Sequence, residues 1–198
     1  MSNTMSSEFK IIEEAKKPLS MHPKKFALWL FIASVIMLFA AWTSAYIVKR
    51  GDIGWSEIIL PQQFYVNTVI IALSSVSMIW AVRAARQNSR DQLKVAITIT
   101  MVLGLAFLAG QFLAYAEMVA LKQFLTGGNV SHSFIYVISG AHAAHVIGGV
   151  FYLVIVFFSA YRNQVHSGAM TRIEMCATYW HFLGLLWLYL FVFLILNP

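Results

Sequence analysis

The chain alternates between long apolar runs and short polar breaks, a pattern that predicts membrane-spanning helices. Five runs almost free of charge lie at residues 26–48, 63–82, 95–120, 132–160 and 174–196. Each is long enough to cross about 30 Å of hydrocarbon as a helix, which takes roughly 20 residues. The breaks are rich in charged residues, glycine or proline, which favour turns. We therefore expect an all-α fold, a polytopic membrane helix bundle with five transmembrane helices.

Composition excludes a water-soluble domain. Of the 198 residues, 60% are hydrophobic and 11% are charged, and this charged fraction is about half of that in a typical soluble domain. No break is long enough to hold a second domain, so we expect an N-terminal tail at residues 1–25 and one five-helix domain at residues 26–198. The first run is too long for the core of a cleavable signal peptide. A single cysteine, Cys176, excludes an internal disulfide framework.

Basic residues are unevenly divided among the breaks, which predicts the orientation of the chain, because positively charged segments next to spans stay in the cytoplasm. With a cytoplasmic N-terminus, that side holds eleven basic residues: Lys10, Lys16, Lys17, Lys24, Lys25, Arg83, Arg86, Arg90, Lys94, Arg162 and Arg172. The other side holds three: Lys49, Arg50 and Lys122. We therefore predict a cytoplasmic N-terminus and a C-terminus on the opposite, periplasmic side. The net charge of +6 then follows from topology and contact with anionic lipid, so no nucleic-acid partner is expected.

Polar residues inside the apolar runs are few, and each is costly at membrane depth, so each needs a role. The candidates for polar packing between helices are Asn67, Gln111, Glu117, His142, His145, Glu174, Thr178 and His181. No run carries the dense polar lane that an ion or sugar pathway requires, which disfavours a transporter. Aromatic residues near the span ends are expected to anchor the chain at headgroup level; they are Trp29, Tyr46, Trp80, Tyr161 and Tyr179.

Two histidines of the fourth run, His142 and His145, lie three positions apart and share a helix face, close enough to chelate one metal in principle. A further ligand would come from another span. His181 is expected about 10 Å from the inner end of the fifth span, and His145 about 22 Å from that of the fourth. This difference disfavours a shared metal or haem site, although a b-type haem electron carrier using His142 or His145 with His181 stays as a rival hypothesis.

Hydrogen bonding between helices is the preferred interpretation of these histidines. Gly140, Ala144 and Gly148 form a ridge of small residues beside them, and such ridges let another helix approach closely in membranes. In the fifth run, Glu174, Thr178 and His181 share one face, which is expected to point into the bundle, while Trp180 and Trp187 form a separate stripe.

Four segments, in order, resemble subunit III of the haem–copper oxidases, in the short five-helix bacterial form. They are VNTVIIALSSVSMIWA at 66–81, LGLAFLAGQFLAYAEM at 103–118, SGAHAAHVIGG at 139–149 and YWHFLGLLWLYLF at 179–191. The resemblance implies a noncatalytic accessory subunit of a respiratory terminal oxidase, most similar to the cytochrome c type, in a bacterial cytoplasmic membrane. It implies support of proton uptake and of stability during turnover, while the assembled complex reduces oxygen to water and pumps protons.

The resemblance also implies cofactors and partners. Haem and copper would lie in partner subunits, with no catalytic, cofactor or metal residue in this chain, and phospholipid would be bound. Subunit I would be the direct partner, together with subunit II and other small subunits, and cytochrome c or a quinol-oxidising complex would supply electrons. The same subunit of a quinol oxidase, or a homologue associated with a nitric oxide reductase, stays as an alternative.

Four residues, at three places in the chain, depart from the family pattern. Many members carry a glutamate in the first span, where this chain has Ser34 as its polar residue, and an acid at the position of Ala114. Many also have Asp-Val where this chain has Gly184 and Leu185. Mechanisms of the family that use those carboxylates are therefore not expected of this chain.

The division of basic residues generates a topological prediction. A reporter fused after Gly51 should be external, and one fused after Asn88 should be cytoplasmic. Two reporters, each active on only one side of the membrane, measure on which side each fusion point lies. An external signal after Asn88 and a cytoplasmic signal after Gly51 would reject the orientation.

Overall fold

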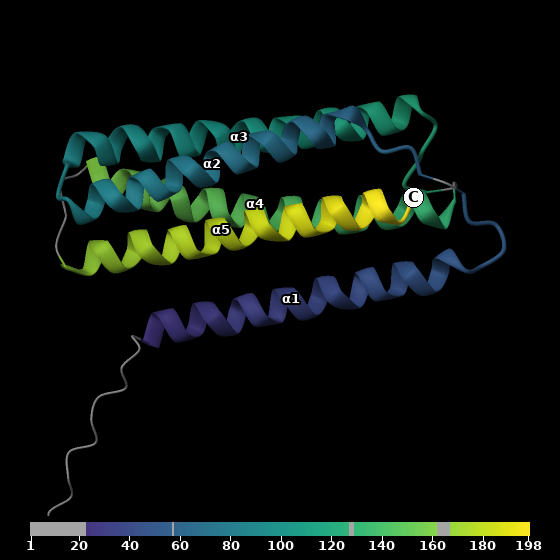
Figure 1. The fold of residues 1–198 in the computed structure, drawn as a ribbon, viewed down its shortest axis with the longest axis horizontal. Helices are drawn as coiled ribbons and strands as arrows, with labels where there is room; N and C mark the ends of the chain where they lie inside the picture. The colour runs from purple at the N-terminus through teal and green to yellow at the C-terminus, as the bar shows by residue number, and fades with distance from the viewer. Residues whose placement is uncertain (1–22, 57, 127–128, 162–166) are drawn as a thin grey trace, which may run out of the picture.

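The computed structural model describes residues 23–56, 58–126, 129–161 and 167–198. Its five helices are α1 (Pro23–Arg50), α2 (Gln62–Arg86), α3 (Arg90–Ala120), α4 (Val130–Tyr161) and α5 (Ser167–Leu196), drawn in Figure 1. All five are long and apolar enough to span a membrane. The expected all-α bundle of five transmembrane helices is therefore confirmed. Most of the expected tail, residues 1–22, and Arg162 of the basic count lie outside the described residues.

Every helix is longer than the apolar run that predicted it. The helices have 25 to 32 residues, which corresponds to about 38–48 Å and exceeds the ~30 Å hydrocarbon core. The additional turns are polar: α3 starts at Arg90 and Asp91, and α5 starts at Ser167, seven residues before the predicted span. The helices therefore continue into the headgroup region, where charged side chains reach water.

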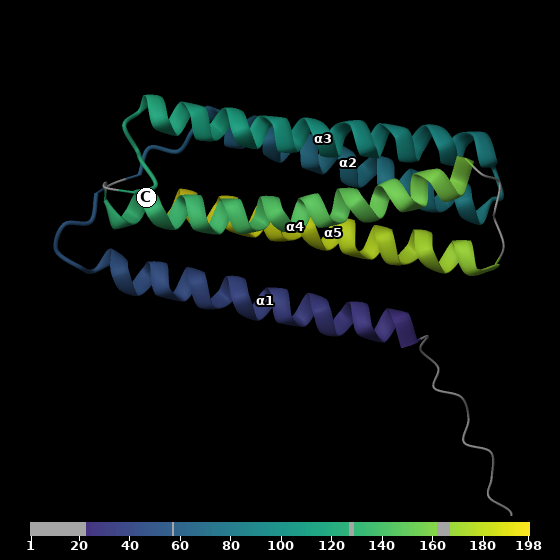
Figure 2. The ribbon, with the colours of Figure 1, turned by 180° about the vertical axis from the view of Figure 1, so that it is seen from behind.

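Helices α2 to α5 form a bundle, and α1 lies outside it. Helix α2 packs on α3 and α5, and α4 packs on the same two helices from the other side, while α1 contacts only α4 and α5. Figures 1 and 2 show α1 as the outlying helix from both sides of the molecule. The long faces of α1 are correspondingly open, with Trp29 55% and Met37 71% exposed.

The C-terminal end of α1 is fixed to the bundle by Tyr46. Its ring is fully buried and makes edge contacts with Trp55, Phe134 and Phe193. Its hydroxyl donates to the carbonyl of Asn197. The expectation that Tyr46 and Tyr179 anchor the chain at headgroup level is wrong, since both rings are buried, and Tyr179 donates to the carbonyl of His145. Trp29, Trp80 and Tyr161 are exposed near helix ends.

Glycines allow close packing at Gly104, Gly110 and Gly149. An added Cβ would lie 2.6 Å from Trp180 at Gly104, 2.0 Å from Asn67 Oδ1 at Gly110, and 2.8 Å from Leu183 at Gly149. No side chain larger than hydrogen fits at such distances. Gly104 therefore sets the spacing between α3 and α5, and Gly110 sets that between α3 and α2. Gly149 sets the spacing between α4 and α5.

The expected ridge of small residues on α4 does not make this close approach within the described residues. Ala144 and Gly148 are exposed, a Cβ on Gly148 would meet nothing within 4 Å, and one on Gly140 would be 3.6 Å from Tyr115. The close contact falls instead on Gly149, because one residue turns the helix by about 100°.

These distances predict opposite effects for two matched substitutions. Gly110→Ala should destabilise the folded chain by about 1–3 kcal/mol, because the new methyl group overlaps Asn67. Gly148→Ala should be neutral or stabilising by up to about 1 kcal/mol, since alanine favours the helix and the site is open. Thermal unfolding in mild detergent measures both, and equal effects would contradict the packing described for Gly110.

Candidate functional site

His142 lies in an aromatic environment at the centre of the bundle. It is completely buried, and its ring centroid is 5.2 Å from that of Trp187 on α5 and 5.9 Å from that of Phe107 on α3. Neither ring nitrogen has a hydrogen-bond partner among the described residues. The expected hydrogen bond between helices is therefore not present here, because the neighbouring helices present rings at this level.

His145 faces α1. Its Nδ1 lies 2.7 Å from the carbonyl of Ala141, one turn earlier in α4, so the bond stays within the helix. Its ring contacts Phe39 and Phe31, with centroids 5.7 and 6.4 Å apart. These contacts make His145 part of the packing between α1 and α4.

The depth difference expected between His145 and His181 is wrong. His181 lies 14 residues after the start of α5 at Ser167, and His145 lies 16 residues before the end of α4 at Tyr161. These separations are about 21 and 24 Å, so the two histidines have similar depths. Rotation about the helix axes separates them instead: His145 faces α1, whereas His181 lines a groove beside α2.

A chain of hydrogen bonds crosses three helices. Asn67 Nδ2 on α2 donates to Gln111 Oε1 on α3 at 3.2 Å, and Gln111 Nε2 donates to the Tyr115 hydroxyl at 3.5 Å. The Tyr115 hydroxyl lies 3.2 Å from Ser139 Oγ on α4, which in turn donates to the carbonyl of Ile135. Both amides are buried, and amide pairs of this kind hold membrane helices together.

Glu117 completes the N-terminus of α2. The residue before this helix is Pro61, which offers no side-chain cap. The two carboxylate oxygens of Glu117 on α3 accept the backbone N–H groups of Gln62 and Gln63 at 3.1 and 3.4 Å. A negative charge at a helix N-terminus is stabilised by the free N–H groups and the helix dipole. Glu117 therefore fixes the ends of α2 and α3 to each other.

The tryptophan stripe, rather than the face with Glu174 and His181, points into the bundle from α5. Trp180 and Trp187 are each 1% exposed. Their indole N–H groups donate to Ser74 and Thr68 of α2, each at 3.0 Å. The larger apolar rings take the interior of the bundle because they gain most from packing there.

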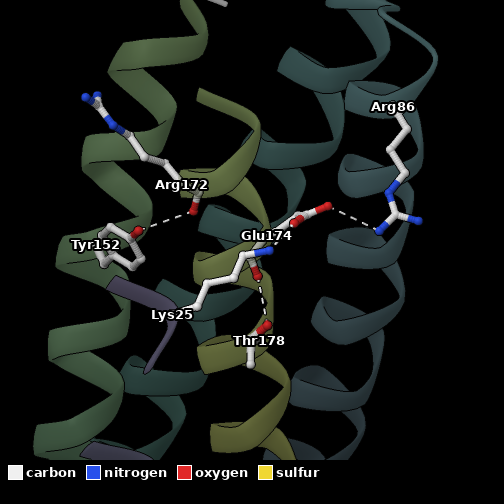
Figure 3. Close-up of polar contacts among 6 residues, drawn as sticks. All are labelled: Lys25, Arg86, Tyr152, Arg172, Glu174 and Thr178. Atoms are coloured by element: carbon white, nitrogen blue, oxygen red, sulfur yellow. Dashed lines mark hydrogen bonds and ion pairs between the residues drawn. The ribbon is translucent and has the colours of Figure 1, made fainter. Parts of the chain in front are cut away.

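Glu174 joins three helices near the start of α5, as Figure 3 shows. Its carboxylate lies 2.8 Å from Lys25 Nζ on α1 and 3.3 Å from an Arg86 guanidinium nitrogen on α2. Thr178 donates to the backbone carbonyl of Glu174 within α5. We call the end of the molecule that carries these three charged residues the basic end.

A groove runs from the basic end along α5. Its first cavity has a volume of about 450 Å³ and is bounded by Lys25, Arg83, Arg86, Glu174 and His181 among others. A second cavity of about 410 Å³ shares His181 with the first, and a third of about 370 Å³ shares Leu185 with the second. Both are lined mainly by apolar side chains. A groove with a charged mouth and apolar walls can hold an amphiphilic molecule.

The positions that depart from the family pattern lie in different surroundings. Ser34 is exposed on α1 and donates to the carbonyl of Phe31 in its own helix, whereas Ala114 is fully buried in α3. At Gly184, an added Cβ would lie 3.1 Å from Ser75 Oγ. In the parts of the chain that the structure describes, no three His, Cys, Asp or Glu side chains gather as a metal site would require.

The fold and the groove define a multi-pass α-helical membrane protein. The profile of the family described as cytochrome c oxidase subunit III matches residues 7–197. The chain belongs to this family, whose redox centres lie in other subunits, and membership implies that it partners with other oxidase subunits.

Individual relatives carry two kinds of name. A probable cytochrome c oxidase subunit 3 of Rickettsia bellii is 28% identical over 92% of this chain and 72% of its own length. A cytochrome bo(3) ubiquinol oxidase subunit 3 of Buchnera aphidicola is 25% identical over 98% of this chain and 93% of its own. Against a probable cytochrome c oxidase subunit 3 of Rickettsia felis, 33% identical, the match covers 65% of this chain and 46% of the relative.

The buried amide pair can be tested by a double-mutant cycle. Asn67→Leu and Gln111→Leu should each destabilise the chain by about 1–3 kcal/mol, because each leaves one buried polar atom of the other amide, Gln111 Oε1 or Asn67 Nδ2, without its partner. The double variant should cost clearly less than the sum, since neither of these two amide atoms is then left in the core without its partner. Unfolding in mild detergent gives the three free energies, and strict additivity would show that the two amides do not interact.

Proposed function

We propose that this chain is a noncatalytic accessory subunit of a respiratory terminal oxidase in a bacterial cytoplasmic membrane, directly beside subunit I. Subunit II and other small subunits complete the complex, and cytochrome c supplies its electrons. Haem and copper lie in the partner subunits. This chain orders phospholipid at the flank of subunit I and so supports proton uptake and stability during repeated turnover.

The observation that supports this function best is the groove along α5. It is open to the surroundings, has charged side chains at one end and apolar walls beyond, and runs along α5 beside α1 and α2. A phospholipid has the same division of polar and apolar parts. Lipid held there would give neighbouring proton-uptake groups of the partner a defined, dry boundary.

A b-type haem carrier fits the site less well. Phe107 and Trp187 contact the ring of His142, and both are fully buried, so a haem ligated by His142 would have to displace them. His145 points toward α1 and His181 toward the groove beside α2, so their rings face different neighbours.

A quinol oxidase is the second candidate for the assembled complex. It is favoured by the Buchnera aphidicola relative, whose match covers nearly all of both chains. The two candidates differ in the electron donor, which partner subunits bind. Reduced cytochrome c and a reduced quinol, each offered to the purified complex, distinguish them.

Removal of the chain from a purified complex should leave the initial rate of oxygen consumption largely unchanged, because the redox centres lie elsewhere. Activity should then decay faster over successive turnovers, and proton uptake should slow more at higher pH. Oxygen consumption followed over time, with the reconstituted complex as control, measures this. Immediate loss of activity together with loss of haem absorption would contradict the proposal.

A further inference from the structure

The first cavity of the groove, here called the mouth, carries a net positive charge. Lys25, Arg83 and Arg86 face one carboxylate, that of Glu174, so the balance of these four groups is +2. Figure 3 shows Lys25 and Arg86 on either side of Glu174, with which both form ion pairs. Arg83 is exposed, and no hydrogen bond or ion pair joins it to another described residue. Its guanidinium is therefore available for a carboxylate.

The mouth also exposes apolar side chains beside these charges. They come from three helices: Leu28 and Trp29 of α1, Ile79 and Val82 of α2, and Met175 of α5. Trp29 is 55% and Ile79 41% exposed. An occupant that complements this surface carries negative charge together with apolar side chains.

The N-terminal tail, which precedes the residues that the structure describes, contains a segment with both properties. Residues 8–14, EFKIIEE, hold three glutamates and one lysine, so their net charge is −2. Three of the eight acidic residues of the whole chain fall within these seven positions. Phe9, Ile11 and Ile12 stand between the glutamates. The segment thus matches the mouth in the sign and size of its charge and in its apolar content.

The segment is tethered next to the mouth. The tail leads into α1 at Pro23, and the first two turns of α1 supply Lys25, Leu28 and Trp29 to the wall of the mouth. The nine residue steps from position 14 to Pro23 can span up to about 30 Å when extended, which exceeds the size of a cavity of about 450 Å³. A short tether of this kind costs little entropy to close. Segment and mouth also lie on the same side of the membrane, because the tail runs directly into the helix that lines the mouth.

From this match we infer that residues 8–14 lie across the mouth of the same chain and cover it. The adjacent carboxylates of Glu13 and Glu14 pair with Arg83, and the apolar side chains of the segment pack on Trp29 and Ile79. The segment covers the charged cavity and leaves the two apolar cavities of the groove open. It thereby screens the ion pairs that join α1 to the bundle from water and from soluble anions. The inference goes beyond the proposed function and does not depend on it, because it concerns contacts within one chain.

Carbodiimide cross-linking of the full chain in mild detergent tests the placement. The reagent joins a carboxylate to an amine only where the two are in direct contact, and Arg83→Lys supplies an amine in the mouth while keeping the positive charge. Peptide mass spectrometry should find residue 13 or 14 joined to position 83. Arg90→Lys, at an exposed position of α3 outside the mouth, is the matched control and should give several-fold less product. Glu13→Gln together with Glu14→Gln should abolish the product at position 83.

Labelling of an introduced thiol with a neutral, water-soluble maleimide tests whether the segment covers the mouth. Thr178→Cys places a thiol in the mouth, and Gln87→Cys places one at an exposed position of the same end outside it. The native thiol, Cys176, is only 1% exposed. Adding Glu13→Gln and Glu14→Gln should speed labelling at position 178 roughly fivefold, as expected for the loss of two exposed ion pairs. Labelling at position 87 should not change, and high salt should act like the substitutions because it screens exposed charges.

Two results would overturn the inference. One is equal cross-linking at positions 83 and 90, or no product at position 83. The other is labelling at position 178 that Glu13→Gln and Glu14→Gln leave unchanged. The same cross-linking on the assembled complex identifies a competing occupant: if the product forms in the separated chain and is lost in the complex, a partner subunit covers the mouth and the inference is wrong. The proposed function fails separately, in the measurement of oxygen consumption.

Discussion

The structure depends on one constraint: hydrocarbon offers no hydrogen-bond partner, so a polar group at membrane depth is costly unless it finds a partner within the protein. Helix α2 meets most of this demand. It accepts two indole N–H groups of α5, pairs its Asn67 with Gln111 of α3, and receives the carboxylate of Glu117 at its N-terminus. Because each of these bonds joins different helices, they specify which helices are neighbours as well as stabilising the fold.

Helix α1 has a different arrangement, in which the polar bonds to the bundle lie toward the helix ends. Lys25 holds one end through Glu174, and Tyr46 and Arg50 hold the other through the C-terminal residues. Between these ends, contact is made mainly by rings such as Phe39 against His145. The open groove on the α5 side of α1 is the result. Firm attachment at two ends with open walls between them gives a stable surface feature that lipid can fill.

The fold was predictable from the sequence because the apolar runs are longer than any soluble core helix needs. The ends of the helices were not predictable, since α5 continues through polar residues back to Ser167. Placing the start of this helix at residue 174 produced the wrong depth for His181. The faces of α5 were also assigned wrongly: polarity suggested that Glu174 faces inward, whereas the packing of Trp180 and Trp187 decides the orientation. Close approach at Gly149 rather than Gly148 depends on the shape of the opposing helix, which one sequence pattern does not contain.

The central claim is that this chain contributes to an oxidase through structure and not through electron transfer. The most direct measurement is an absorption spectrum of the complex purified through a tag on this chain, taken before and after the chain is separated from its partners. The account predicts a Soret band in the complex, carried by a large co-purifying subunit, and none in the separated chain. A Soret band that stays with this chain, or purification without any haem-bearing partner, would contradict it.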